Sequence, residues 1–276
     1  GEATIPQTAD KNWNKYQWFN GTSDFVQTVD TVDMPSQSGF TYSFWFFGSD
    51  VTSSQAGVAG YDGATLRQFL SIRPTGLIFY IDSAVTVYEL TDANSFTVND
   101  WNHCVGVYDA GTIRLYVNGT LQASTTTGSP GSTYTRYNEL TLGSRKAAAN
   151  ALAGILDDVT IFSDALSTPD VSTLYSAGRK ATLAVGTPDY RWFNTGNTDS
   201  DWIDQVGIND GTVNGSPSNV LVTASDANDQ IDALGTAISE PRLNTQQINL
   251  FGDGEYSLTP DSASLDLTTT ATWELW

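Results

Sequence analysis

Short runs rich in valine, isoleucine, threonine, tyrosine and phenylalanine follow one another along the first part of the chain, with glycine, aspartate, asparagine or proline between them. Such closely spaced runs are typical of antiparallel strands joined by turns. In the run 113–119, Ile113, Leu115 and Val117 alternate with Arg114 and Tyr116, which predicts one buried and one exposed face. The pattern therefore predicts an all-β fold built as a two-sheet antiparallel β-sandwich. The clearest runs cover residues 25–29, 40–47, 68–72, 76–81, 85–90, 103–109, 113–119, 139–144 and 156–162.

A single helix signal follows the last of these runs. Ser167 is a good N-cap, and Asp170 stands three residues later, where its side chain can complete a capping box. Val171 and Leu174 form an apolar stripe, and Gly178 can end the helix. The sequence predicts a helix of about two turns that closes the first domain.

The segment after this helix changes in character. Residues 179–188 resemble a linker, and the chain beyond them is acidic. Residues 19–28 and 40–45 resemble residues 251–259 and 271–276, and three matched positions share one offset, since 252−21, 256−25 and 276−45 all equal 231. The repeat predicts a second sandwich that is cut off inside a core strand, so that either further chain or a neighbouring subunit completes it. The predicted organisation is an N-terminal arm (1–11), a complete sandwich (12–178), a linker (179–188) and an incomplete second sandwich (189–276).

The charge balance argues against two classes of partner. The chain has 12 basic and 31 acidic residues and a net charge of −19. A nucleic-acid binder needs clustered basic residues, and an anionic membrane surface attracts them as well, so neither nucleic acid nor membrane insertion is expected. No apolar run approaches the roughly 20 residues of a membrane-spanning helix.

The single histidine and the single cysteine are neighbours, His103 and Cys104, in a predicted strand. A Ser-His-Asp mechanism would require His103 as its base. A structural role in packing is the stronger interpretation for both residues, because no basic residue or helix start near Cys104 marks a reactive thiolate.

Four stretches in the expected order resemble the laminin-G-like, concanavalin-A-like superfamily, which includes pentraxins. They are "FNGTSDFV" (19–26), "FTYSFWF" (40–46), "DWNHCVGVYDAGTIRLYVNG" (100–119) and the closing stretch from "LTLGS" to "LYSAG" (140–178). The resemblance implies a jelly-roll sandwich for residues 12–178. It covers 189–276 less well, where only opening segments match.

The resemblance also bears on catalysis and on metals. The family's glycosidases use a Glu-x-Asp-x-x-Glu arrangement, which is missing here, so no enzyme activity is expected. Relatives place calcium on an aspartate of the last long strand, which corresponds to Asp157; the alternative is that Asp157 and Asp158 form hydrogen bonds at a strand end. The acidic ligands of the pentraxin calcium site would fall near Arg67 and near 143–150, where basic and small residues stand instead.

Glycan binding on sandwiches often uses exposed aromatic rings. Tyr61, Tyr134 and Tyr137 lie in predicted loops and are the candidates. The leading hypothesis is a non-enzymatic structural and interaction protein on an extracellular or virion surface, such as a phage tail, fibre or capsid-decorating component, with other copies, other structural subunits or a cell-surface glycan as partners. Two alternatives stay open: a secreted bacterial adhesin or carbohydrate-binding module, and a diverged glycosidase.

Overall fold

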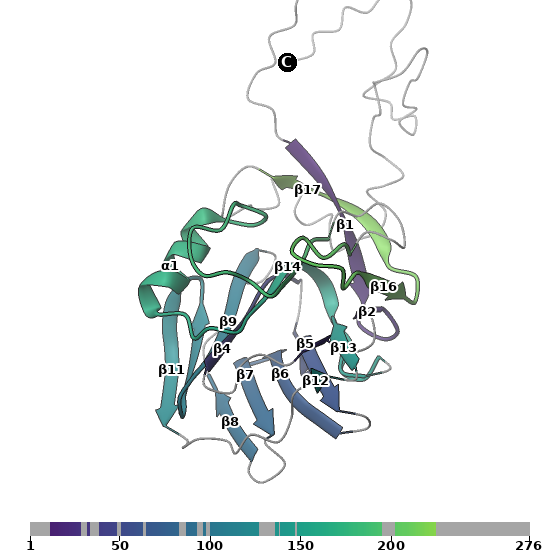
Figure 1. Ribbon diagram of the computed structural model, residues 1–276. Helices are drawn as coiled ribbons and strands as arrows, with labels where there is room; N and C mark the ends of the chain where they lie inside the picture. The colour runs from purple at the N-terminus through teal and green to yellow at the C-terminus, as the bar shows by residue number, and fades with distance from the viewer. Residues whose placement is uncertain are drawn as a thin grey trace, which may run out of the picture.

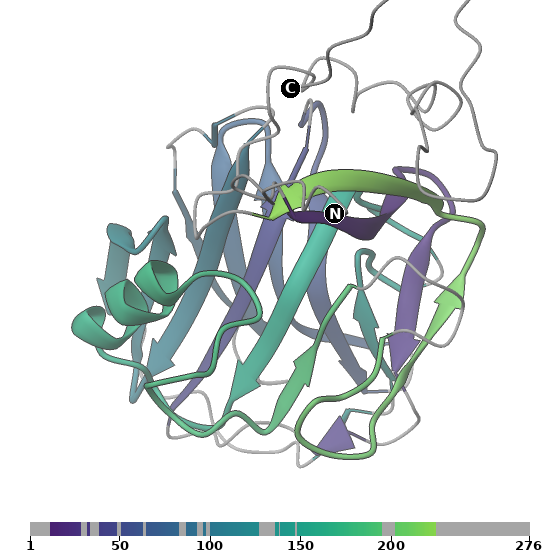
Figure 2. The same cartoon turned by 90° about the horizontal axis from the view of Figure 1, so that it is seen from above.

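The computed structural model describes residues 12–28, 32–33, 39–48, 51–62, 65–82, 87–92, 96–97, 100–126, 136–137, 139–146, 148–194 and 202–224. Two antiparallel sheets dominate these residues and face each other as the layers of a sandwich (Figures 1 and 2). The all-β, two-sheet prediction is therefore confirmed.

The larger sheet has eight strands, seven of them in the order β11-β10-β9-β4-β14-β1-β17, while β15 pairs with β14. Its strands are β1 (Asn12–Asn20), β4 (Gly39–Phe47), β9 (Trp101–Asp109), β10 (Thr112–Val117), β11 (Thr120–Thr126), β14 (Ala153–Phe162), β15 (Tyr190–Trp192) and β17 (Ser218–Ala224).

The smaller sheet has seven strands in the order β16-β2-β13-β5-β6-β7-β8. They are β2 (Phe25–Thr28), β5 (Gln55–Asp62), β6 (Thr65–Arg73), β7 (Gly76–Asp82), β8 (Val87–Thr91), β13 (Glu139–Leu142) and β16 (Gly211–Asn214). A separate pair joins β3 (Val32–Asp33) to β12 (Arg136–Tyr137).

The core between the sheets follows from alternation along the strands. On β10 the predicted inward residues Ile113, Leu115 and Val117 all join the main hydrophobic cluster, which confirms that prediction. Gly106 on β9 lacks a side chain for a steric reason, because a Cβ atom there would lie 2.9 Å from the Phe79 ring of the opposite sheet.

The eight-stranded sheet is buried on its outer face as well. The helix α1 (Thr168–Ala177) packs there, and its Val171 and Leu174 join a cluster with Val105 and Val107 of β9. Figures 1 and 2 show α1 at the edge of the molecule, next to β11. The Ser167 capping box that the sequence predicts is present, so the helix begins and ends as expected.

The described residues at the start of the predicted second sandwich, 189–194 and 202–224, belong to the first one. Strand β15 pairs with β14, β16 with β2, and β17 with β1 over seven residue pairs from Asn12↔Ala224 to Trp18↔Ser218. Trp192 and Trp202 are fully buried in the main core. The physical reason is that the exposed edges of β1 and β2 need partners, and this segment supplies both. The repeat at 251–276 and the arm at 1–11 lie outside the described residues.

Candidate functional site

Two carboxylates, Asp157 and Asp158, lie side by side beneath the segment that follows α1. If β14 were regular, they would point to opposite faces. A bulge between Asp157 and Thr160 shifts the register against β4, and Asp158 adopts a left-handed φ of 45°. Both carboxylates therefore face Lys180, which approaches Asp157 through its Nζ atom and Asp158 through its backbone N–H.

Basic side chains surround both carboxylates. The Oδ2 atom of Asp157 lies 3.5 Å from Arg179 Nη1 and 3.4 Å from Lys180 Nζ, and its Oδ1 accepts a 2.9 Å hydrogen bond from the backbone N–H of Asn194. Asp158 accepts two hydrogen bonds from Arg191, at 2.6 and 2.7 Å. Burial raises the pKa of Asp157, and the nearby charges of Lys180 and Arg179 oppose that rise. The cluster is a closed ion-pair network.

This network bears directly on the predicted calcium site at Asp157. Hard cations bind several oxygen ligands, but here two protein cations already contact the carboxylate. Within the described part of the chain, no three His, Cys, Asp or Glu side chains gather in a way that could hold a metal ion. The residues present therefore do not fit calcium at this position, and the hydrogen-bonding alternative describes what Asp157 and Asp158 do.

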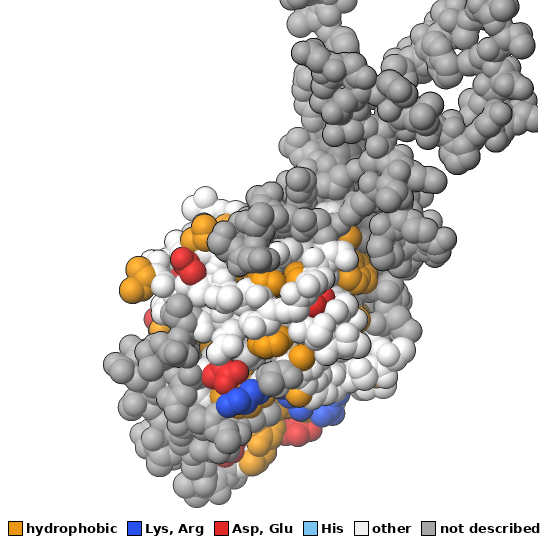
Figure 3. Space-filling model, turned by 90° about the vertical axis from the view of Figure 1, so that its right-hand side faces the viewer, with side chains coloured by type: hydrophobic (Ala, Val, Ile, Leu, Met, Phe, Trp, Pro, Cys, Tyr) orange, Lys and Arg blue, Asp and Glu red, His pale blue; other side chains and the backbone are white. Residues whose placement is uncertain are grey.

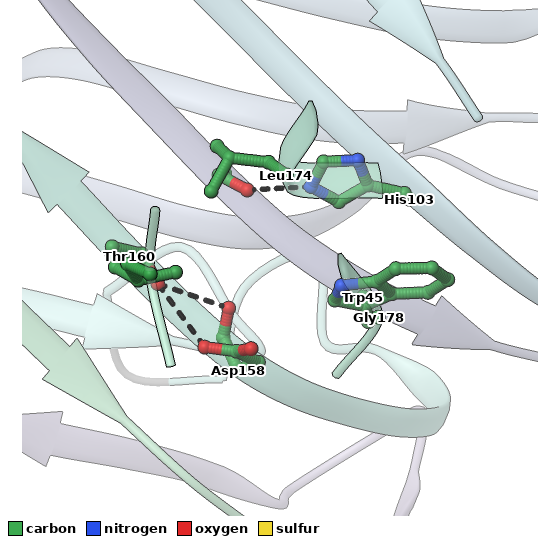
Figure 4. Close-up of a pocket in the computed structure, with 8 residues that line it drawn as sticks. Trp45, His103, Asp158, Thr160, Leu174 and Gly178 are labelled. Atoms are coloured by element: carbon green, nitrogen blue, oxygen red, sulfur yellow. Dashed lines mark hydrogen bonds between the residues drawn. The ribbon is translucent and has the colours of Figure 1, made fainter. Parts of the chain in front are cut away.

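The one histidine lies beside this network, at a small internal cavity of about 10 Å³ (Figure 4). Its Nε2 atom lies 2.8 Å from the Ser43 hydroxyl oxygen, and its ring stacks on Trp45. Burial lowers the pKa of His103 to about 4, and the charge of Asp158 only partly opposes this, so the ring is neutral at physiological pH.

The arrangement of Ser43, His103 and Asp158 is not a catalytic triad. In a triad the acid binds the imidazole, whereas Figure 4 shows Asp158 bonded to Thr160, and His103 Nδ1 has no hydrogen-bond partner among the described residues. The cavity has room for about one water molecule, which is too little for a substrate. The structural interpretation of His103 therefore fits the geometry. Cys104 is fully buried, and burial raises the pKa of its thiol, as for a packed, unreactive cysteine.

A second group of candidate side chains lies on the outer face of the seven-stranded sheet. Thr141, Ala59, Phe69, Tyr80 and Glu89 occupy directly paired positions on β13, β5, β6, β7 and β8, so they form one row across the sheet. The turn after β13 places Arg145 over the ring of Phe69 and Lys146 over the ring of Tyr61 on β5. We call the following set the basic–aromatic patch: Tyr61, Phe69, Arg73, Tyr80, Glu89, Glu139, Arg145 and Lys146.

Two rings of the patch stack on each other. Phe69 and Tyr80 are nearly parallel, with ring centroids 4.8 Å apart, which is the spacing of neighbouring strands. The guanidinium carbon of Arg145 lies 3.8 Å from the centroid of Phe69. Phe69 is only 3% exposed, so the groups that solvent reaches are mainly the charged ones.

Two of the three cations in the patch have acidic partners. Lys146 lies 3.1 Å from Glu139, and Arg73 lies 3.8 Å from Glu89. Figure 3 views the molecule from the side on which β13 and β5 lie in Figure 1, and it shows basic side chains next to acidic ones among hydrophobic and neutral surface. Burial lowers the pKa of Arg145, and the charge of Arg73 adds to that shift, while Tyr61 and Glu89 oppose it.

The three tyrosines predicted to bind glycans lie in different parts of the chain's structure, and one lies outside the described residues. Tyr61 belongs to the patch, although it lies in β5 rather than in a loop; it is 5% exposed, and its hydroxyl accepts a hydrogen bond from the Lys146 backbone. Tyr137 lies in β12, which packs against β5. Tyr134 lies outside the described residues. No sequence motif marked Phe69, Tyr80 and Arg145 as candidates, although alternation along β6 and β7 places the two rings on one face.

The sequence from residue 20 to 172 matches the family model described as the concanavalin A-like lectin/glucanases superfamily. A protein from Bacteroides ovatus, described as a candidate carbohydrate-binding protein, has a similar structure, with a TM-score of 0.56 and 18% identity over 79% of this chain. The chain spans 62% of the length of that protein.

The heptameric SAP-like pentraxin from Limulus polyphemus is also similar, with a TM-score of 0.50 and 13% identity over 74% of this chain and 97% of the pentraxin. At such identities the likeness shows the fold alone. No curated protein matches the sequence. Among the described residues, no helix has the length and apolar character needed to cross a membrane.

Proposed function

This chain belongs to the concanavalin A-like lectin/glucanases superfamily, and from that premise we propose that it is a non-enzymatic, lectin-like domain that binds glycans through the basic–aromatic patch. The observation that carries the proposal is the row of paired positions that brings Phe69, Tyr80 and Glu89 side by side, with Arg145 over the ring of Phe69. Guanidinium and carboxylate groups beside a half-buried aromatic ring on one rigid sheet can hold a saccharide, because its polar groups bind the charged side chains and its C–H groups contact the edge of the Tyr80 ring.

The carboxylates of the buried network support the non-enzymatic part of the proposal. Glycoside hydrolysis needs one carboxyl group as acid and a second as nucleophile or base, both facing the substrate. Asp157 is fully buried against Arg179 and Lys180, and Asp158 is bound to Arg191. Neither carboxylate can reach a glycosidic bond. The description of the Bacteroides ovatus protein as a candidate carbohydrate-binding protein also supports glycan binding.

We propose that the chain acts at an extracellular or virion surface, as its composition suggests. The low content of basic residues and the neutral polar surface motivate it. Other copies of the chain or other structural subunits are then its protein partners. Purified virions or cell envelopes that contain the chain in fixed stoichiometry would support this location, whereas a chain found only in the cytosol would contradict it.

A glycan array with the full chain tests the glycan-binding proposal. We expect a reproducible hit that is lost on Tyr80→Ala, which removes the half-buried ring of the patch. The matched control is Tyr190→Ala on β15, where a half-buried tyrosine stacks on Trp192 in the other sheet. A hit that survives Tyr80→Ala, or no hit on a broad array, contradicts the proposal. Release of reducing ends from any bound glycan would contradict its non-enzymatic part.

A further inference from the structure

We infer that the basic–aromatic patch selects anionic saccharides, which carry carboxylate or sulfate groups, and that Arg145 is the residue that binds the anion. The inference rests on the proposed glycan binding and names the class of ligand for that same surface. Its basis is the difference between Arg145 and the two other cations of the patch.

Among the described residues, Arg145 has no ion-pair partner of the kind that the other two cations have. Lys146 pairs with Glu139 and Arg73 pairs with Glu89, but the Arg145 guanidinium makes neither an ion pair nor a hydrogen bond with any residue that the structure describes. Its known contact is the face of Phe69 at 3.8 Å. The charge of Glu89 acts on Arg145, but no carboxylate among the described residues lies within ion-pair distance of its guanidinium, so in a chain with a net charge of −19 this arginine is an available anion-binding group.

The stack of side chains holds this guanidinium in place. Phe69 packs on one side against Arg145 and on the other against Tyr80, so the arginine is oriented before a ligand arrives. An arginine fork that is fixed in this way loses little conformational entropy on binding a carboxylate or sulfate. The partial burial that lowers the pKa of Arg145 also strips water from its charge, so an anion has less hydration to displace.

The same stack disfavours a neutral saccharide. A neutral sugar gains its affinity on such surfaces largely by laying its C–H face on an open aromatic ring. The face of Phe69 is occupied by Arg145, and the neighbouring ring of Tyr80 stacks on it from the other side. Tyr61 and Phe69 are each 5% or less exposed, so neither offers a platform for stacking.

Among the described residues, this face of the sheet also has buried polar atoms that are unsatisfied. The Nε atom of Arg145 and the Oγ atom of Ser71 are buried and have no hydrogen-bond partner among the described residues. Ser71 is two residues along β6 from Phe69, and it therefore lies on the same face of the sheet. The overall negative charge does not prevent anion binding, because charges beyond about 8 Å are screened at physiological ionic strength.

Calorimetry with the full chain and three oligosaccharides of equal length tests the inference: oligogalacturonate for carboxylate, a sulfated carrageenan fragment for sulfate, and a cello-oligosaccharide as the neutral probe. We expect binding of at least one anionic probe and a loss of about tenfold or more on Arg145→Gln, since charge-assisted hydrogen bonds contribute that much. Arg145→Lys, which keeps the charge but not the fork, should lose less. Arg114→Gln, at an arginine that pairs with Asp109 on the other sheet, is the matched control and should bind as the unmodified chain does.

The possible outcomes separate the two proposals. A neutral probe that binds best, with equal affinity in Arg145→Gln, overturns the anionic inference but leaves glycan binding intact. Anionic probes that bind equally well to Arg145→Gln and to the unmodified chain overturn the role of Arg145. No binding of any oligosaccharide, here and on the array, overturns the glycan-binding function itself. Circular dichroism of each variant confirms that the sandwich is folded.

Discussion

Trp202 gives the sharpest test of where the folded domain ends. It lies beyond the predicted linker, yet it is fully buried in the core of the sandwich. Its ring stacks on Phe19 with centroids 5.9 Å apart, and its Nε1–H donates a 2.8 Å hydrogen bond to the side-chain oxygen of Gln17. Both partners belong to β1, at the other end of the described chain.

The substitution Trp202→Ala removes this ring. Truncating a buried tryptophan costs about 3–5 kcal/mol through lost burial and the cavity that remains. The buried oxygen of Gln17 also loses its donor, which costs a further 1–3 kcal/mol, roughly. Together the free energy of unfolding should fall by about 4–8 kcal/mol, against a total of about 5–15 kcal/mol for an ordinary domain.

Urea unfolding followed by circular dichroism measures this effect. The matched control is Ile208→Ala, in the same loop, where the side chain is 88% exposed and should contribute less than about 0.5 kcal/mol. If Trp202→Ala changed the free energy of unfolding by no more than the control does, residues 202–224 would not be part of this core. The same result would restore the boundary at 179–188 that the sequence predicts.

Three further predictions concern the buried polar groups. His103 has a folded-state pKa of about 4, below its ordinary value of 6.5, so the unfolded chain binds the proton more readily. The free energy of unfolding should be fully present above pH 6.5 and fall by about 3 kcal/mol as the pH drops toward 4. In His103→Gln, this part of the pH-dependent unfolding profile should be flat. Arg191→Met leaves the buried Asp158 carboxylate without its ion-pair partner and should lower the free energy of unfolding in urea by about 3–5 kcal/mol. Arg114→Met, at a half-exposed ion pair, should lower it by at most about 1 kcal/mol. Equal losses would show that burial does not set the contribution of these ion pairs. Because Arg179 and Lys180 neutralise Asp157, millimolar calcium or a chelator should move the melting temperature of the full chain by less than about 1 °C in differential scanning calorimetry, and a clear rise with calcium would show a site that this network does not explain.

Much of the candidate site could not be predicted from the sequence, because it depends on which strands become neighbours in the sheet. Alternation on β6 and β7 could place Phe69 and Tyr80 on one face, but only the sheet order makes them neighbours. The position of Arg145 over Phe69 depends on how the turn after β13 folds back, which no local pattern encodes. The local sequence around Asp157 does not indicate that Arg179 and Lys180 neutralise this carboxylate. The bulge at Asp158 turns both carboxylates toward these residues, which are more than 20 positions away in the chain.

The sequence by itself determined the local features of this protein: the strands, the inward side of β10, the capped helix and the membership of the superfamily. These depend on side-chain periodicity and on capping residues within a few positions of one another, which local physics fixes. Only the tertiary structure decided which segment closes the sandwich and which charges neutralise one another. Residues 190–194 and 202–224 belong to the first sandwich because the edges of β1 and β2 pair with strands that are near them in space, and nearness in space is not encoded by local sequence.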